Sequence, residues 1–115
     1  MEWGKTMKIS EITQKLDLKI ITQADFKDRD VSGCYIGDLL SLVMSKAQMN
    51  NIWITVQTNI NIVAVATLTD VSFIVIPEEI VVDEGTIKRA NMQDVVIFGS
   101  SKNSYEIACD ISKLL

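Results

Sequence analysis

Histidine is absent from the 115-residue sequence. Its absence removes the side chain that most often acts as a general base, carries a phosphoryl group or binds a metal ion. The two cysteines, Cys34 and Cys109, stand far apart and fit no metal-ligand spacing. Free thiols in a sequence without a secretion signal predict a cytoplasmic protein. We expect neither a metal ion nor another cofactor.

Basic side chains are few and scattered. The sequence has 11 lysines and arginines against 15 aspartates and glutamates, a formal net charge of -4. Such a surface repels the phosphates of DNA and RNA, so nucleic acid is not an expected partner. The most apolar region, residues 60–82, is interrupted by Asp70, Pro77 and Glu78 and lacks the ~20 apolar residues of a membrane span. We therefore expect this region to belong to a core and no part of the chain to enter a membrane.

Aliphatic side chains are abundant. Hydrophobic residues make up 48% of the chain and charged residues 23%, which is typical of a globular domain. A chain of this length forms one domain and buries roughly two thirds of its unfolded surface. We expect that domain at residues 7–115, with residues 1–6 as an N-terminal extension, because the first periodic segment begins at Met7. Either Met1 or Met7 fits as the natural start.

Helical and strand patterns alternate along the chain. In order, they predict a helix at 9–16, a strand at 18–21, an extended segment at 31–36, a helix at 38–47 capped by Asp38, a strand at 52–56, a helix at 60–68, a strand at 71–76, a helix from 83 or 84 to 92, a strand at 94–98 and a helix near 105–114. Residues 60–68 are apolar on every side and also fit a buried strand, but a parallel crossover between the flanking strands needs a helix of about this length. The alternation predicts an α/β fold, with a largely parallel five-stranded sheet flanked by helices.

An acid-arginine-acid cluster, Asp28-Arg29-Asp30, begins the most distinctive segment and contains one of the two arginines. The segment resembles the DRTGG domain, whose characteristic run is approximately D-R-x-V-T-G-G-Y-V-S-D-L-L-S. Ser32 replaces the threonine of that run, and Cys34 replaces its second glycine. Identical residues are Asp28, Arg29, Val31, Gly33, Tyr35, Asp38, Leu39, Leu40 and Ser41. Residues 53–58 and 61–66 resemble the W-I-T-x-Q-T and N-V-V-A-V-A segments of the same domain, so the resemblance spans residues 7–115.

The resemblance implies a regulatory or dimerising module without catalytic residues of its own. DRTGG domains occur beside CBS domains in inorganic pyrophosphatases, at one end of some phosphotransacetylases and as stand-alone proteins, and their fold is similar to the N-terminal domain of HPr kinase/phosphorylase. If the position of Cys34 requires a positive φ or a close approach to a ligand, the side chain of Cys34 obstructs that contact.

The segment from Asp28 to Asp38, with the helix after it, is the predicted interface. Arg29 could bind a phosphate or a partner's carboxylate, but the flanking acids favour an ion pair that fixes the loop to its own domain or to a second copy. Leu40, Met44 and Met49 suggest an apolar patch that a partner covers. The predicted interface residues are Asp28, Arg29, Asp30, Ser32, Gly33, Tyr35, Asp38, Leu40 and Met44.

A second candidate site follows two predicted strands. Residues 57–59 and 99–101 should meet at the carboxyl edge of the sheet, where open α/β folds bind ligands. Neither segment has a phosphate-loop signature, and helix capping explains both equally well. The candidate ligand-binding residues are Gln57, Thr58, Asn59, Gly99, Ser100 and Ser101.

The sequence thus favours a non-catalytic homodimeric regulatory module that acts on a partner enzyme encoded nearby. The alternative function is a sensor that binds an adenine nucleotide or a phosphorylated metabolite at the carboxyl edge. An enzyme is the third hypothesis, in which Asp28, Asp30 and Asp38 would have to hold Mg²⁺ together. Trp53 and Tyr35 are expected to be packing anchors, Cys34 a buried thiol and Cys109 a core residue.

Overall fold

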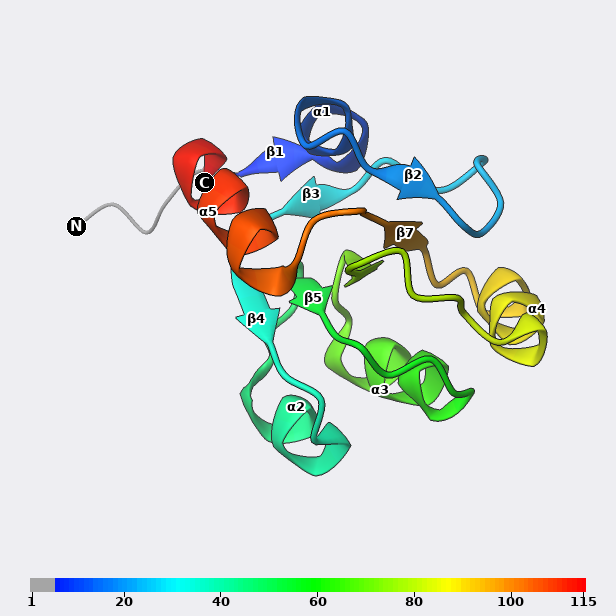
Figure 1. Ribbon diagram of the computed structural model, residues 1–115. Helices are drawn as coiled ribbons and strands as arrows, with labels where there is room; N and C mark the ends of the chain where they lie inside the picture. Colours follow the sequence, from blue (N-terminus) through cyan, green and yellow to red (C-terminus); the bar gives the residue numbers. More distant parts are fainter. Residues whose placement is uncertain (1–5) are drawn as a thin grey trace.

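The computed structural model describes residues 6–115, which form seven strands and five helices (Figure 1). The helices are α1 (Ile9–Lys15), α2 (Leu40–Lys46), α3 (Asn61–Thr69), α4 (Glu84–Met92) and α5 (Ser104–Leu114). The strands are β1 (Met7–Lys8), β2 (Lys19–Ile20), β3 (Asp30–Val31), β4 (Cys34–Ile36), β5 (Ile52–Ile54), β6 (Phe73–Ile76) and β7 (Ile97–Gly99). The predicted N-terminal extension lies outside the described residues except for Thr6. No helix in the described part of the chain is both long and apolar enough to span a membrane.

Five strands form one sheet in the order β2-β7-β6-β5-β4. Strands β4, β5, β6 and β7 are parallel, and β2 pairs antiparallel with β7. The predicted α/β class, with a largely parallel five-stranded sheet flanked by helices, is therefore confirmed. β1 and β3 form a separate two-stranded antiparallel sheet that the sequence patterns did not predict.

Helices cover both faces of the five-stranded sheet, as Figure 1 shows. On one face, α1, α5 and the small β1-β3 sheet enclose a cluster of buried apolar side chains. On the other face, α2, α3 and α4 enclose a second cluster. Strand β5 contributes to both, because successive side chains of a strand point to opposite faces. Ile52 and Ile54 enter the first cluster, and Trp53 enters the second.

Several local predictions are confirmed. Residues predicted as a helix at 60–68 form α3, and the helix predicted from Asp83 or Glu84 is α4, with Asp83 as its N-terminal cap residue. Trp53 is a packing anchor: it is 0% exposed, and its indole N–H donates to the carbonyl of Gly37 at 2.9 Å. Cys109, predicted to be core, is only partly buried on α5.

The predicted extended segment at 31–36 is divided between two sheets. Its first residue belongs to β3 and its last three to β4, and the chain turns at Gly33, whose φ is +71°. The positive φ therefore falls on Gly33, whereas Cys34 lies in a strand. A side chain at position 33 would also be crowded, because a Cβ built there lies 2.9 Å from Nδ2 of Asn51.

Asp38 does not cap the helix that follows it, so that prediction was wrong. Helix α2 begins after Leu39 without a side-chain cap. Oδ1 of Asp38 instead accepts hydrogen bonds from the hydroxyl of Thr55 at 2.8 Å and from the backbone N–H of Val56 at 2.9 Å. Parallel pairing brings the carboxyl ends of β4 and β5 together. The carboxylate of Asp38 is bound there by donors that directly follow β5, so it is not available to cap α2.

We predict that Gly33→Ala lowers the free energy of unfolding by about 1 to 3 kcal/mol, because alanine must adopt the left-handed conformation and displace Asn51. Gly85→Ala is the matched control, since a Cβ there has no neighbour within 4 Å and the residue lies in α4. Urea unfolding measures both. Equal stability of the two variants would contradict the assigned role of Gly33.

Candidate functional site

Arg29 joins three turns at the amino edge of the sheet, the edge at which the parallel strands begin. One guanidinium nitrogen donates to Oδ1 of Asp70 at 2.8 Å. The other donates to Oδ1 of Asn50 at 2.6 Å and to the carbonyl of Asp70 at 3.0 Å. Asn50 precedes β5 and Asp70 precedes β6, and both have positive φ. The planar fork of the guanidinium therefore fixes two strained turns and its own loop in one arrangement.

The two acids beside Arg29 also have partners within the chain. The carboxylate of Asp28 accepts hydrogen bonds from the backbone N–H of Ser10 at 2.9 Å and from its hydroxyl at 2.7 Å, and so satisfies the first turn of α1. Asp30 forms an ion pair with Lys8 at 2.9 Å across the small β1-β3 sheet. Arg29 therefore forms its ion pair within the chain, with Asp70, and the two flanking acids expected to neutralise it bind other partners.

These contacts shift the ionisation of exposed groups. The backbone and hydroxyl hydrogen bonds from Ser10 lower the pKa of Asp28. The hydrogen bond and charge of Asp30 raise the pKa of Lys8. A lowered aspartate pKa and a raised lysine pKa both favour the charged forms of these side chains. The charged forms are the ones that make the contacts described above.

The three acids of the enzyme hypothesis do not gather. Asp28 and Asp30 lie near the amino edge, whereas Asp38 follows β4 at the carboxyl edge, where Thr55 and Val56 bind it. Within residues 6–115, no group of three acidic, cysteine or histidine side chains is arranged to hold a metal ion.

At the carboxyl edge, the predicted ligand-binding residues are engaged in local contacts. Nε2 of Gln57 donates to the carbonyl of Asp38 at 3.0 Å, and Oδ1 of Asn59 accepts from the N–H of Asn61 at 2.9 Å in the first turn of α3. The carbonyl of Thr58 accepts the hydroxyl of Thr86 at 2.7 Å. These contacts are local, but neither segment supplies a side-chain cap: α3 has none, and α5 is capped by Asn103.

The other candidate segment lies two strands away. The hydroxyl of Ser100 accepts the N–H of Lys102 at 3.1 Å, Ser101 is exposed, and Gly99 ends β7 beside Ile21. The loop after β6 separates Gln57–Asn59 from Gly99–Ser101. No hydrogen bond joins the two segments in the described part of the chain.

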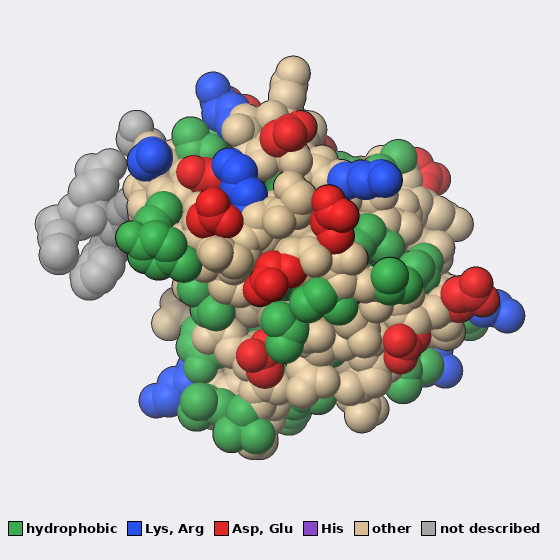
Figure 2. All heavy atoms as spheres, in the orientation of Figure 1, with side chains coloured by type: hydrophobic (Ala, Val, Ile, Leu, Met, Phe, Trp, Pro, Cys, Tyr) green, Lys and Arg blue, Asp and Glu red, His purple; other side chains and the backbone are tan. Residues whose placement is uncertain are grey.

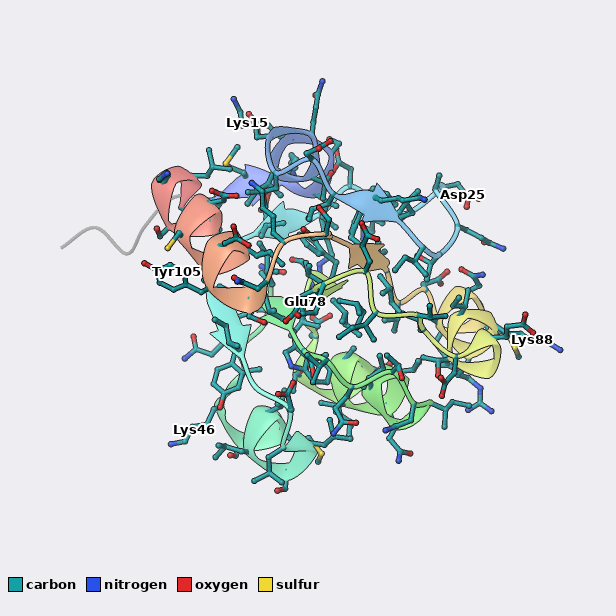
Figure 3. The ribbon with its side chains drawn as sticks, viewed as in Figure 1. Lys15, Asp25, Lys46, Glu78, Lys88 and Tyr105 are labelled. Atoms are coloured by element: carbon teal, nitrogen blue, oxygen red, sulfur yellow. The ribbon has the colours of Figure 1, made fainter. Side chains whose placement is uncertain are left out.

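This edge is acidic. Figures 1 to 3 view it from the front, and Glu78 lies near the centre of Figure 3. Acidic side chains are spread over the middle of the face in Figure 2, and most basic ones lie near its outline. Glu78 and Glu79 both have positive φ, while Lys102 is bound to Asp110 at 2.7 Å. A phosphate at this edge would therefore meet mainly carboxylates.

A cleft of about 420 Å³ opens at the opposite, amino edge. Three segments line most of it: the loop after β2, the end of α3 with the start of β6, and the end of α4 with the start of β7. We call it the amino-edge cleft. Sequence reasoning missed it, because its residues, apart from Ile9, come from positions 22–29, 66–73 and 90–96, and only Arg29 and Ala66 belong to a recognised motif.

Exposed apolar side chains lie on β4, in the loop after it, on α2 and on α5. They are Ile36 (49% exposed), Leu39 (66%), Leu42 (45%), Met44 (49%) and Tyr105 (76%). Figure 2 shows hydrophobic side chains down the left outline, and Figure 3 labels Tyr105 at α5 above β4 and Lys46 at α2 below it. We call this set the apolar band.

The sequence identified part of the apolar band. Met44 is exposed as predicted, and Met49 is exposed in the turn after α2. Leu40 and Tyr35, both predicted interface residues, pack partly buried against the core. Ile36, Leu39, Leu42 and Tyr105 were not identified as candidates for this surface.

Cys34 is a largely buried thiol, as predicted. Burial raises its pKa to about 12, so the thiol stays protonated at neutral pH. A protonated thiol is a poor nucleophile, which gives Cys34 a packing role in β4.

We predict that Arg29→Lys lowers the free energy of unfolding by about 1 to 2 kcal/mol, because an ammonium group cannot reach Asn50 and both oxygens of Asp70 together. Arg89→Lys on the exposed side of α4 is the matched control and should change stability little. Denaturant titration of both variants gives the comparison. If Arg89→Lys lost as much stability as Arg29→Lys, the contacts of Arg29 would have no special stabilising role.

We also predict that the stabilising contribution of Asp28 is lost in acid. Its folded-state pKa is lowered, so its contribution is present above the ordinary aspartate pKa of about 3.9 and is lost as the pH falls toward the folded-state value. Asp28→Asn should reduce this dependence, measured as the difference between unfolding midpoints at neutral and acidic pH. An identical difference in both proteins would show that Asp28 does not contribute.

The fold of this chain is similar to that of a solved structure. No family model matches the sequence, and no curated protein matches it. A solved structure containing the CBS and DRTGG domains of the regulatory region of Clostridium perfringens pyrophosphatase, complexed with the activator diadenosine tetraphosphate, is similar with a TM-score of 0.72 and 12% identity. The match covers 90% of this chain and 45% of that one, so this chain spans less than half of its length. The fold of this chain is that of a DRTGG-like domain, as its motif predicted.

Proposed function

We propose that this chain is a non-catalytic regulatory module that forms a homodimer and acts on a partner enzyme. The observation that carries the proposal is the apolar band, the exposed apolar side chains on β4, in the loop after it, on α2 and on α5. Soluble monomers seldom leave contiguous apolar surface exposed, and such surface marks sites of association. The band also contains the exposed aromatic ring of Tyr105, and tyrosine is enriched at interfaces.

The backbone of β4 offers a second means of association. The carbonyl of Gly33 accepts the N–H of Ile52, and the N–H of Gly37 donates to Ile54, so alternate residues bond to β5. Cys34 and Ile36 therefore direct their backbone groups away from β5. Among residues 6–115, no strand pairs with that side of β4. An unpaired edge strand is a template for another strand.

A second copy of the chain fits this edge. Two β4 strands related by a two-fold axis would pair antiparallel, and the same apolar band from each copy would meet in the interface. Asp38 directly precedes Leu39 in the chain and Lys46 ends α2, so charges of both signs flank residues of the apolar band in the sequence. The dimer would continue the five-stranded sheet into its partner.

The fold likeness supports a regulatory role. The similar structure is the regulatory region of a pyrophosphatase, and this chain matches under half of it. A module of this size would act by associating with an enzyme on another chain or on a further part of a longer one. We propose that the dimer is the form that engages this enzyme.

A sensor is the second candidate function, favoured by the nucleotide activator in the similar structure. The carboxyl edge is a poor place for such a ligand, because Asp38 follows β4 and Glu78 and Glu79 follow β6, so their carboxylates would repel its phosphates. Association is therefore the first proposal.

We predict that the wild-type chain is a dimer and that Leu42→Asp makes it a monomer, because a carboxylate within the apolar band would have to be desolvated in the interface. Sedimentation equilibrium measures the mass of each. Leu42 is 45% exposed, so the monomeric variant should still unfold cooperatively, with a midpoint lowered only by the loss of the stabilisation that dimerisation supplies.

Leu68→Asp is the matched control. Leu68 is 71% exposed on α3, a helix that contributes no residue to the apolar band, and its variant should remain a dimer. A monomeric wild type at high micromolar concentration, or an equal effect of both substitutions, would contradict the proposed interface.

A further inference from the structure

The amino-edge cleft has an apolar floor and a polar rim. Buried side chains form the floor, among them Ile9, Phe73 and Val96. Exposed polar side chains form much of the rim, including Gln23, Thr67 and Gln93. A volume of about 420 Å³ with this distribution is typical of a small-molecule site, in which the floor supplies burial and a few polar groups fix orientation.

One wall of the amino-edge cleft is aromatic. Phe26 lies in the loop after β2, lines the cleft and is held edge-on against Phe98, with ring centroids 5.9 Å apart. The loop is itself tied to α4, because Oδ1 of Asn91 accepts the N–H of Gln23 at 2.9 Å. A fixed ring beside a polar rim suits a flat heterocycle that stacks on one side and forms hydrogen bonds at its edges.

The charges of the amino-edge cleft disfavour an anion. Arg29 and Asp70 are paired with each other at 2.8 Å. The remaining charged side chains of the lining are Lys27, Asp25 and Asp94, which leave an excess of negative charge. Figure 3 places Asp25 in the loop after β2, on the side of the molecule where α4 lies. A phosphate would be repelled, whereas an uncharged ring with donors and acceptors would not.

We propose that the amino-edge cleft binds an uncharged nucleoside or free nucleobase, stacked on Phe26 and contacted at its edges by the polar rim. The rim offers both kinds of hydrogen-bonding group that a base requires. The amide of Gln93 donates and accepts, and the hydroxyl of Thr67 donates to the carbonyl of Val63 at 3.0 Å and keeps accepting capacity.

Occupancy of the amino-edge cleft would reach the dimer interface through Arg29. This side chain lines the cleft and binds Asn50, in the turn that directly follows α2. α2 carries Leu42 and Met44 of the apolar band. This consequence rests on the proposed function, but the binding itself does not.

The test is isothermal titration calorimetry of the full chain with adenosine, guanosine, cytidine and uridine, and with the four corresponding 5′-monophosphates. At least one nucleoside should bind at millimolar concentration or below, and its monophosphate should bind about tenfold more weakly because of the carboxylates. Thr67→Trp should abolish binding by filling the cleft from α3. Thr69→Trp, on the same helix but outside the lining, should not.

A second variant tests the charge argument without filling the cleft. Asp25→Lys, in the exposed loop, should remove the preference for the nucleoside over its monophosphate. No binding of any nucleoside to the wild type, binding that survives in Thr67→Trp, or tighter binding of the monophosphate by the wild type would each overturn the proposal. Leu42→Asp should still bind the same nucleoside, with an affinity that differs from wild type only by the coupling to the dimer, so a failed dimer and an empty cleft give different results.

Discussion

The arrangement of the amino edge depends on the guanidinium of Arg29. Asn50 and Asp70 each have positive φ, a conformation that costs energy for residues other than glycine, and Arg29 binds both. The hydroxyl of Ser72 adds bonds to the carbonyls of Asp30 and Asn50 at 2.6 and 3.0 Å. These contacts align the starts of β4, β5 and β6, and so determine where β4 presents its free edge.

Local patterns predicted the helices and the central strands, because their apolar periodicity needs no information from elsewhere in the chain. They failed where distant residues decide the outcome. Asp38 accepts a hydrogen bond from Thr55 instead of capping α2. Residues 31–36 do not form one strand, because Val31 pairs with β1 and residues 34–36 pair with β5. Periodicity also predicted α2 without indicating which of its leucines the sheet would cover: Leu40 packs against the core, whereas Leu39 and Leu42 are exposed.

The candidate sites show the same division. The acid-arginine-acid cluster was found because it is contiguous, and its role as an internal ion-pair system follows from partners that the sequence could not place, namely Ser10, Asn50 and Asp70. The amino-edge cleft was missed because its lining comes from three distant segments. The contacts of Arg29 hold the turns of the amino edge together, and the amino-edge cleft lies beside them. The carboxyl edge is acidic. The free edge of β4 and the apolar band are the surfaces that we propose for association.

The central claim is that β4 pairs with a second copy of itself. Hydrogen exchange of individual backbone amides, followed by NMR at increasing protein concentration, tests it most directly. The account predicts that exchange at Cys34 and Ile36 slows as concentration rises, because their N–H groups become bonded across the interface, while exchange at the exposed end of α3 stays constant. Exchange at Cys34 and Ile36 that does not change with concentration would contradict the claim.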